Sequence, residues 1–261
     1  MKTIIQVWSH YYYNKKPDKY NNFWGIGDIL RGTMNLYLYC RKNNYNFVVD
    51  IHLHELSKYI IENNHSYTNL IEKNKNNIPF VKGGELDKFI NNSTEDNIFL
   101  FTNLNKQINN PDEDTINFMK NLLKPNKDLQ NYIDQYLKIY NNFKIIHFRL
   151  GDNELVRNNN KNLDFQKYLN ILEKVHFSEN DILISDSNRF KKFIEKSKIK
   201  IKILKTNPSH IGLNNDLKDT LLEFFLLSKA KKIYSYSVHG WNSGFVQWNS
   251  IIFEKDVVFI K

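Results

Sequence analysis

The stretch FKIIHFRLGD, residues 143–152, lies just past the middle of this chain. An apolar run there ends in a histidine, an arginine, a glycine and an aspartate. On a strand, His147 and Arg149 point to the same side of the sheet. Gly151 then permits a sharp turn, after which Asp152 can hold Arg149 or cap the loop. This pattern predicts a buried strand whose carboxyl end carries polar side chains.

Strands and helices alternate on both sides of this stretch. Downstream, the pattern predicts strands at 181–186, 199–204, 232–237 and 257–260, and helices at 165–175, 189–198, 219–230 and 241–249. Upstream, it predicts strands at 3–8, 45–53 and 97–102, and helices at 30–44, 112–123 and 126–140. Apolar strands separated by amphipathic helices indicate parallel sheets covered on both faces. We therefore predict an α/β chain of two Rossmann-like halves facing a cleft, with the boundary in the helical region 126–142.

The composition and the net charge limit the kinds of partner and the cellular compartment that we expect for this protein. The 261 residues carry a net charge of +9, which suits nucleic acid, an acidic surface or a phosphorylated small molecule as partner. The lysines are scattered, which argues against nucleic acid. The single cysteine, Cys40, cannot form an intrachain disulfide and indicates a reducing compartment. No apolar stretch of about 20 residues and no signal-peptide core occur, so we expect a soluble, cytoplasmic protein without a membrane span.

Polar clusters follow four of the predicted strands, namely GIGD, HFRLGD, SDSN and SYSVHGWNSGF. In doubly wound sheets, ligands bind beyond the carboxyl ends of the strands. In the second cluster, Arg149 can form a fork that bonds two oxygens of a diphosphate. Alternatively, it forms an ion pair with Asp152 that closes the end of the sheet, with His147 as a core histidine behind it.

The first and third clusters each have two interpretations. Gly25 and Gly27 precede a helix, which suits either an anion or sugar at the helix start or a plain tight turn. Leu30 occupies the third position of a G-x-G-x-x-G motif, so a dinucleotide fingerprint is not supported. Asp186 either accepts a hydrogen bond from a ribose or base, or caps the helix that begins near Arg189.

The fourth cluster is rich in small hydrogen-bond donors just before a helix and suits a phosphate. Its polar and small residues are Ser235, Ser237, His239, Asn242, Ser243 and Gly244. Two further groups could suggest a metal. His52 and His54 lack a third ligand and are interpreted as a surface pair. The acidic run 112–114 opens a helix, so we expect no metal.

The motif HFRLGD resembles the H-x-R-x-G-D element of the fucosyltransferase superfamily, which includes the α1,2-, α1,6- and protein O-fucosyltransferases. The segments DTLLEFFLLSKAKKIYSYSVHGWNSGFVQW, WGIGDILRG and ILISDS are similar, in order and spacing, to that family's serine-rich nucleotide-sugar segment, acceptor-side loop and middle element. The resemblance implies a GT-B fold with an acceptor-side domain at 1–140 and a nucleotide-sugar domain at 141–261. It further implies inverting, metal-independent transfer of fucose from GDP-fucose to a glycan or protein hydroxyl.

The resemblance also implies roles for residues, with Arg149 on the β-phosphate. It assigns Asp186 and Glu223 to shaping the nucleotide site, and Ser237, Ser243 and Gly244 to lining it. The full set of residues that we expect to bind the donor is Gly25, Gly27, His147, Arg149, Asp186, Glu223, Ser235, Ser237, Ser243, Gly244 and Phe245. Asp28, Asp152 and Glu154 remain alternatives for the catalytic base, because Arg157 stands where the α1,6 branch carries a glutamate. The expected partners are a nucleotide-sugar donor and a glycan or glycoprotein acceptor, with no cofactor. Two alternatives stay open: another nucleotide sugar as donor, or a non-catalytic module that binds a sugar nucleotide or glycan.

Overall fold

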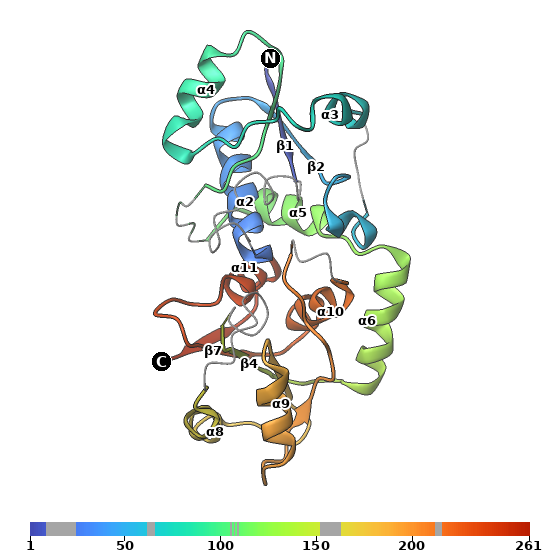
Figure 1. Ribbon diagram of the computed structural model, residues 1–261, viewed down its shortest axis with the longest axis vertical. Helices are drawn as coiled ribbons and strands as arrows, with labels where there is room; N and C mark the ends of the chain where they lie inside the picture. The colour runs from blue at the N-terminus through green and yellow to red at the C-terminus, as the bar shows by residue number, and fades with distance from the viewer. Residues whose placement is uncertain are drawn as a thin grey trace. The chain divides into compact units, whose positions relative to one another are not determined.

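A computed structural model describes residues 1–8, 25–61, 66–104, 106, 108, 110–151, 163–211 and 216–261. Two of the candidate bases, Asp152 and Glu154, lie outside these ranges. The chain forms two compact units, Met1–Asn126 and Lys127–Lys261. Each unit has a parallel sheet, as the sequence predicted (Figure 1).

The first unit is built on a three-stranded parallel sheet in the order β2-β1-β3. Its strands are β1 (Thr3–Val7), β2 (Asn46–Asp50) and β3 (Asn97–Leu100), and its helices are α2 (Ile26–Lys42), η1 (Glu55–Lys58), α3 (Thr68–Asn74), η2 (Gly83–Glu85), α4 (Leu86–Asn92) and α5 (Glu113–Leu122). Ile4 and Ile5 of the central strand belong to separate core clusters. Successive strand residues point to opposite faces, so β1 is covered on both sides. Cys40 packs in the Ile4 cluster as a small hydrophobic residue, and burial raises the pKa of its thiol to about 12.

The helices between β2 and β3 were not predicted from the sequence. The helices α3 and α4 are seven residues each, and α3 buries only Ile71. A helix this short presents two turns, so its apolar stripe contains too few residues to stand out among the surrounding asparagines and lysines.

The second unit has a five-stranded parallel sheet in the order β6-β5-β4-β7-β8. Its strands are β4 (Ile145–Arg149), β5 (Ile182–Ser185), β6 (Lys202–Ile203), β7 (Ile233–Ser237) and β8 (Val257–Ile260), and its helices are α6 (Lys127–Ile139), α8 (Phe165–Glu173), α9 (Asn188–Glu195), α10 (Lys218–Leu227) and α11 (Gly244–Phe253). Helices α10 and α11 lie on one face of this sheet and α8 and α9 on the other (Figure 1). None of the helices in the described ranges is long and apolar enough to cross a membrane.

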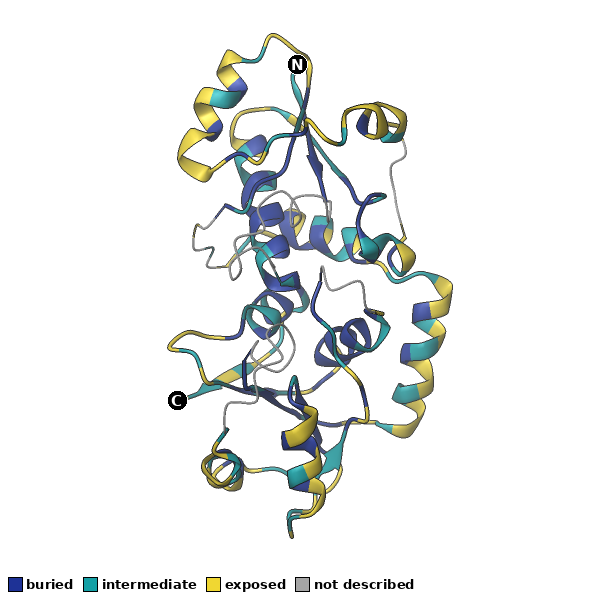
Figure 2. Ribbon diagram, viewed as in Figure 1, coloured by how far each residue is buried: buried dark blue, intermediate teal, exposed yellow. Residues whose placement is uncertain are grey.

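Successive residues of β4 pack against the helices on opposite faces of the sheet. The ring of Phe148 lies 5.1 Å from that of Phe190 on α9, whereas the ring of His147 lies 6.1 Å from that of Phe245 on α11. Helix α10 is buried around almost its whole circumference, as Figure 2 shows. A helix that is apolar all round needs cover on all sides, so α10 belongs to the interior of the unit.

Several predicted elements of this unit have different bounds in the structure, and two of them are informative. The predicted strand 199–204 pairs with β5 only at Lys202 and Ile203, and β6 is an edge strand of the sheet. The predicted helix 241–249 begins instead at Gly244, and Trp241 lies in the exposed loop before it. The first apolar residue of that segment therefore belongs to the loop.

Candidate functional site

The order of strands in the second unit reverses between β4 and β7. The chain passes from β4 to β5 on one side and returns to β7 on the other. Arg149, the last residue of β4, is paired in register with Ser237, the last residue of β7. In doubly wound sheets a ligand binds at such a reversal, beyond the carboxyl ends of the strands. The candidate site is therefore formed by the residues that follow these two strands.

The turn after β4 is fixed by hydrogen bonds from both neighbouring strands. The carboxylate of Asp186 accepts from the backbone N–H of Leu150 at 2.7 Å and of Gly151 at 3.3 Å. The backbone N–H of Val238, after β7, donates to the carbonyl of Arg149 at 3.0 Å. Gly151 has a φ of 111°, a conformation that favours glycine. The half-buried Arg149 side chain therefore starts from a backbone that is held on both sides.

Of the two roles that the sequence left open for Asp186, helix capping falls to its neighbour. The hydroxyl of Ser187 accepts from the backbone N–H of Phe190 at 3.1 Å and caps α9. Asp186 orders the turn that carries Arg149, which is a structural reason for an aspartate at the end of β5.

His147 is a core histidine behind Arg149. The residue is 5 % exposed, and its Nδ1 lies 3.1 Å from the hydroxyl of Ser235. Burial, assisted by the charge of Arg149, lowers the pKa of His147 to about 3. The imidazole is therefore neutral at physiological pH and packs between Ser235 and the ring of Phe245.

The start of α11 offers unused hydrogen-bonding groups. Ser243 is the residue that precedes the helix, and its hydroxyl makes no capping bond. The residue is 1 % exposed, and this hydroxyl has no hydrogen-bond partner among the described residues. Gly244 opens the helix and adds no side chain at its first position. An orphaned buried hydroxyl beside the positive end of a helix is suited to an anion.

Glu223 lies in a buried polar cluster within the unit. Its carboxylate accepts a hydrogen bond from Thr206, whose carbonyl accepts from the Lys191 ammonium at 2.6 Å. Burial raises the pKa of Glu223 to about 7, although the charge of Lys191 opposes this shift. Burial also lowers the pKa of Lys191. Glu223 is only 4 % exposed, so it supports the fold around β6, α9 and α10.

Sequence reasoning did not single out Lys191, although a signal was present. Lys191 follows Phe190 directly and precedes Ile194 by three positions, and all three side chains are buried on one face of α9. A lysine within the apolar stripe of a helix predicts a buried charge that needs a partner.

The shifts of His147 and Glu223 predict opposite pH dependences of stability. Below pH 6.5 the unfolded state binds a proton at His147, whereas the folded state does not bind it until the pH is near 3. The free energy of unfolding therefore falls as the pH drops from 6.5 towards about 3. Between pH 4.5 and about 7 the folded state retains a proton at Glu223 that the unfolded state releases, so stability falls as the pH rises. The two effects offset each other between pH 4.5 and 6.5.

Single substitutions should therefore separate the two effects. In urea unfolding over that pH range, we expect the stability of Glu223→Gln to rise with pH more steeply than that of the wild type. The stability of His147→Gln should rise less steeply or fall. Each slope should change by up to roughly 1 kcal/mol per pH unit. Parallel profiles for the two variants would contradict this assignment.

The remaining described candidates belong to the first unit. Helix α2 begins at Ile26, so Gly27 lies inside the helix, and only Gly25 precedes it. The carboxylate of Asp28 lies in the first turn and pairs with Arg31 at 3.0 Å. This acidic side chain already complements the positive end of α2, which favours the tight-turn interpretation of GIGD over an anion site.

The surface-pair interpretation of His52 and His54 is wrong. His54 is 2 % exposed, and its Nδ1 accepts from the backbone N–H of Leu56. His52 pairs with Asp50 and, at 3.3 Å, with Glu72. Both histidines are thus part of the packed carboxyl end of β2. No group of three metal-ligating side chains was found in the described ranges.

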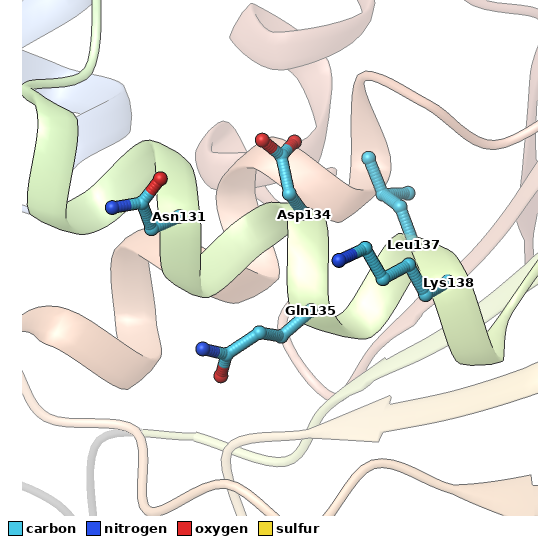
Figure 3. Close-up of a pocket in the computed structure, with 5 residues that line it drawn as sticks. All are labelled: Asn131, Asp134, Gln135, Leu137 and Lys138. Carbon is cyan, nitrogen blue, oxygen red and sulfur yellow. The ribbon is translucent and has the colours of Figure 1, made fainter.

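None of the site residues predicted above lines the pocket on α6. It is lined by Asn131, Asp134, Gln135, Leu137 and Lys138 (Figure 3). All five side chains come from one helix, and four of them are exposed. A hollow on the outer side of a single helix brings no reactive groups together, so we assign it no role.

The structure thus brings several predicted residues to one edge of the second sheet. Arg149 and Ser237 end adjacent strands, and Asp186 binds the turn between β4 and the following loop. His147 and Ser235 lie one layer beneath. Glu223 lies deeper, in the cluster with Lys191.

This chain resembles known proteins in its three-dimensional structure but not in its sequence. No known family profile and no curated protein sequence matches the chain. A fucosyltransferase NodZ structure from Bradyrhizobium has a TM-score of 0.60 at 11 % identity, over 95 % of this chain and 91 % of that one. A NodZ α1,6-fucosyltransferase structure soaked with GDP-fucose has a TM-score of 0.59 at 12 % identity, over 96 % and 92 %. An Arabidopsis thaliana FUT1 variant in complex with GDP has a TM-score of 0.56 at 10 % identity, over 99 % and 70 %. The chain therefore has the fold of the fucosyltransferase structures, and the resemblance seen in its motifs is confirmed at the level of the fold.

Proposed function

We propose that this protein is an inverting, metal-independent glycosyltransferase of the GT-B type that transfers fucose from GDP-fucose to a glycan or protein hydroxyl. One observation carries the proposal: Arg149 ends β4 at the reversal of strand order, beside the strand that leads to the open start of α11. The similar structures are fucosyltransferases, and two of those described above hold GDP or were soaked with GDP-fucose. In this proposal the second unit binds the donor and the first unit serves the acceptor.

The chemistry requires that negative charge on the departing diphosphate be stabilised. As the bond between fucose and GDP breaks, the sugar carbon becomes cation-like and charge collects on the β-phosphate. The guanidinium of Arg149 can donate two parallel hydrogen bonds to phosphate oxygens. The Ser243 hydroxyl and the first N–H groups of α11 supply neutral donors that are already oriented.

An acceptor hydroxyl then attacks the sugar carbon from the face opposite the diphosphate. This attack needs a group that accepts the hydroxyl proton. Asp28, Asp152 and Glu154 remain the candidates for this base. In the structure Asp28 is engaged with Arg31, so an active Asp28 would have to exchange that ion pair for the acceptor.

Selective stabilisation by nucleotides tests the proposed donor. In thermal unfolding, GDP and GDP-fucose at about 100 times Kd should each add ~2.7 kcal/mol, which raises Tm by about 5 to 10 °C. UDP and UDP-sugars should give no shift. Stabilisation by UDP alone would establish another nucleotide sugar as donor. Stabilisation by GDP without transfer of labelled fucose to any member of a glycan array would favour a binding module.

The same assay with two serine variants tests the role of α11. Ser243→Ala should leave the unliganded Tm unchanged or raised, because it removes a buried hydroxyl without a partner, yet reduce the shift caused by GDP. Ser187→Ala is the matched control, because that serine caps α9. It should lower the stability by about 1 kcal/mol and leave the GDP shift intact. An unchanged GDP shift in Ser243→Ala would contradict the proposal that the Ser243 hydroxyl at the start of α11 binds GDP.

A further inference from the structure

The loop between β7 and α11 presents an exposed tryptophan. Trp241 is 69 % exposed, whereas Trp8 and Trp248 are 1 % and 4 % exposed. Its neighbours Gly240 and Asn242 are also exposed. An indole left in water has a large apolar surface that a ligand can cover.

The Trp241 ring is supported on one side. It stacks on the ring of His239 with centroids 4.8 Å apart and an angle of 11° between the planes. The backbone N–H of His239 in turn donates to the hydroxyl of Ser237 at 3.2 Å, which ties this pair to the end of β7. A ring that is already ordered loses little conformational entropy when a ligand stacks on it.

This aromatic pair lies beside the turn that carries Arg149. A Cβ on Gly151 would lie 3.5 Å from Val238 and 3.8 Å from Nε2 of His239, so the two loops are in close contact. Trp241 also precedes Ser243 by two residues, which places their Cα atoms within about 7 Å. Trp241 therefore lies on the loop that leads into the proposed diphosphate site.

The chemistry of the loop suits a carbohydrate. One face of a pyranose ring carries several C–H groups, which pack against the negative face of an indole and cover its apolar surface. The exposed amide of Asn242 can exchange hydrogen bonds with the ring hydroxyls. The attacking hydroxyl must reach the sugar carbon that is bonded to the diphosphate, so the acceptor ring has to lie within this short distance of the helix start.

We infer that Trp241, backed by His239, is the stacking platform for a pyranose ring of the glycan acceptor. This inference rests on the proposed function and adds a residue that selects the acceptor. The proposed ligand of the Trp241 ring is a carbohydrate. A guanine base on the same platform is the competing outcome.

Direct glycan binding tests the inference independently of transfer. Labelled wild-type protein, Trp241→Ala, Trp241→Phe and Phe80→Ala are applied to a glycan array in the presence of GDP. The apparent Kd for the bound glycans should rise about tenfold in Trp241→Ala, and Trp241→Phe should restore most of the affinity. Phe80 is an exposed aromatic residue of the first unit, so Phe80→Ala should bind as the wild type does.

GDP affinity, measured by thermal shift in the same four proteins, distinguishes the outcomes. Equal GDP shifts with a glycan defect only in Trp241→Ala support the inference. A weakened GDP shift in Trp241→Ala would show a platform for the base and overturn it. Equal glycan binding in all four proteins, or no glycan bound by the wild type, would also overturn it. Absence of any GDP shift in the wild type is the separate result that contradicts the proposed function.

Discussion

Arg149→Ala should lower kcat for fucose transfer by about 100- to 1000-fold, which is the usual effect of removing one oriented donor from developing negative charge. The variant loses both hydrogen bonds of the guanidinium fork at the β-phosphate. Because the side chain is half-buried at the end of β4, its truncation leaves the buried residues His147 and Phe148, on the two faces of the sheet, in place. The measurement is single-turnover transfer from labelled GDP-fucose, with circular dichroism to confirm folding.

Two further variants show whether the loss of activity depends on the guanidinium group of Arg149. Arg149→Lys retains the charge but not the planar fork, so we expect an intermediate rate. Arg189→Ala is the matched control, because this exposed arginine of α9 contacts the Phe165 ring at 5.5 Å and has no place in the site. It should transfer fucose at the wild-type rate. Full activity in a folded Arg149→Ala variant would refute the proposed mechanism.

Asp186→Ala should reduce both stability and activity. The backbone N–H groups of Leu150 and Gly151 would lose their acceptor, and both of these residues are buried. Leaving two such donors unsatisfied costs about 3 kcal/mol. The turn that positions Arg149 would also shift, and a displacement of about 1 Å can reduce the rate by ~100-fold. Urea unfolding and single-turnover transfer, measured well below Tm, report the two effects.

Controls for Asp186 separate turn ordering from the loss of a surface carboxylate. Asp186→Asn keeps one acceptor oxygen, so it should lose less than Asp186→Ala in both assays. Asp164→Ala removes an exposed carboxylate that accepts from the Lys167 N–H at 3.0 Å at the start of α8. It should cost about 1 kcal/mol and leave the rate unchanged. Equal losses of stability and of transfer rate in Asp164→Ala and Asp186→Ala would contradict the prediction that Asp186 positions Arg149 by ordering the turn.

The central strands of the second unit could be predicted from the sequence because they are buried on both faces. The strands β4, β5 and β7 consist largely of buried residues, which appear in the sequence as short apolar runs between polar loops. The edge strand β6 and the short helices α3 and α4 lack this signal. Their bounds depend on pairing and packing with distant segments.

The candidate site was predictable in part for the same reason. The position of Arg149 at a strand end follows from the apolar run that precedes it, and the serine-rich start of α11 follows from its composition. The partners of these residues were not predictable. Asp186 and Leu150 are 36 positions apart, and Thr206 and Glu223 are 17 apart.

The α/β class and the central strands could be predicted from the amino-acid sequence alone, because the hydrophobicity of a side chain and its tendency to form turns are properties of local segments. Three features became visible only in the folded chain: Asp186 orders the Arg149 turn, Glu223 and Lys191 share an interior cluster, and Trp241 lies outside α11. These outcomes depend on the order of strands in the sheet, which brings distant segments together, and no local pattern of residues specifies that order.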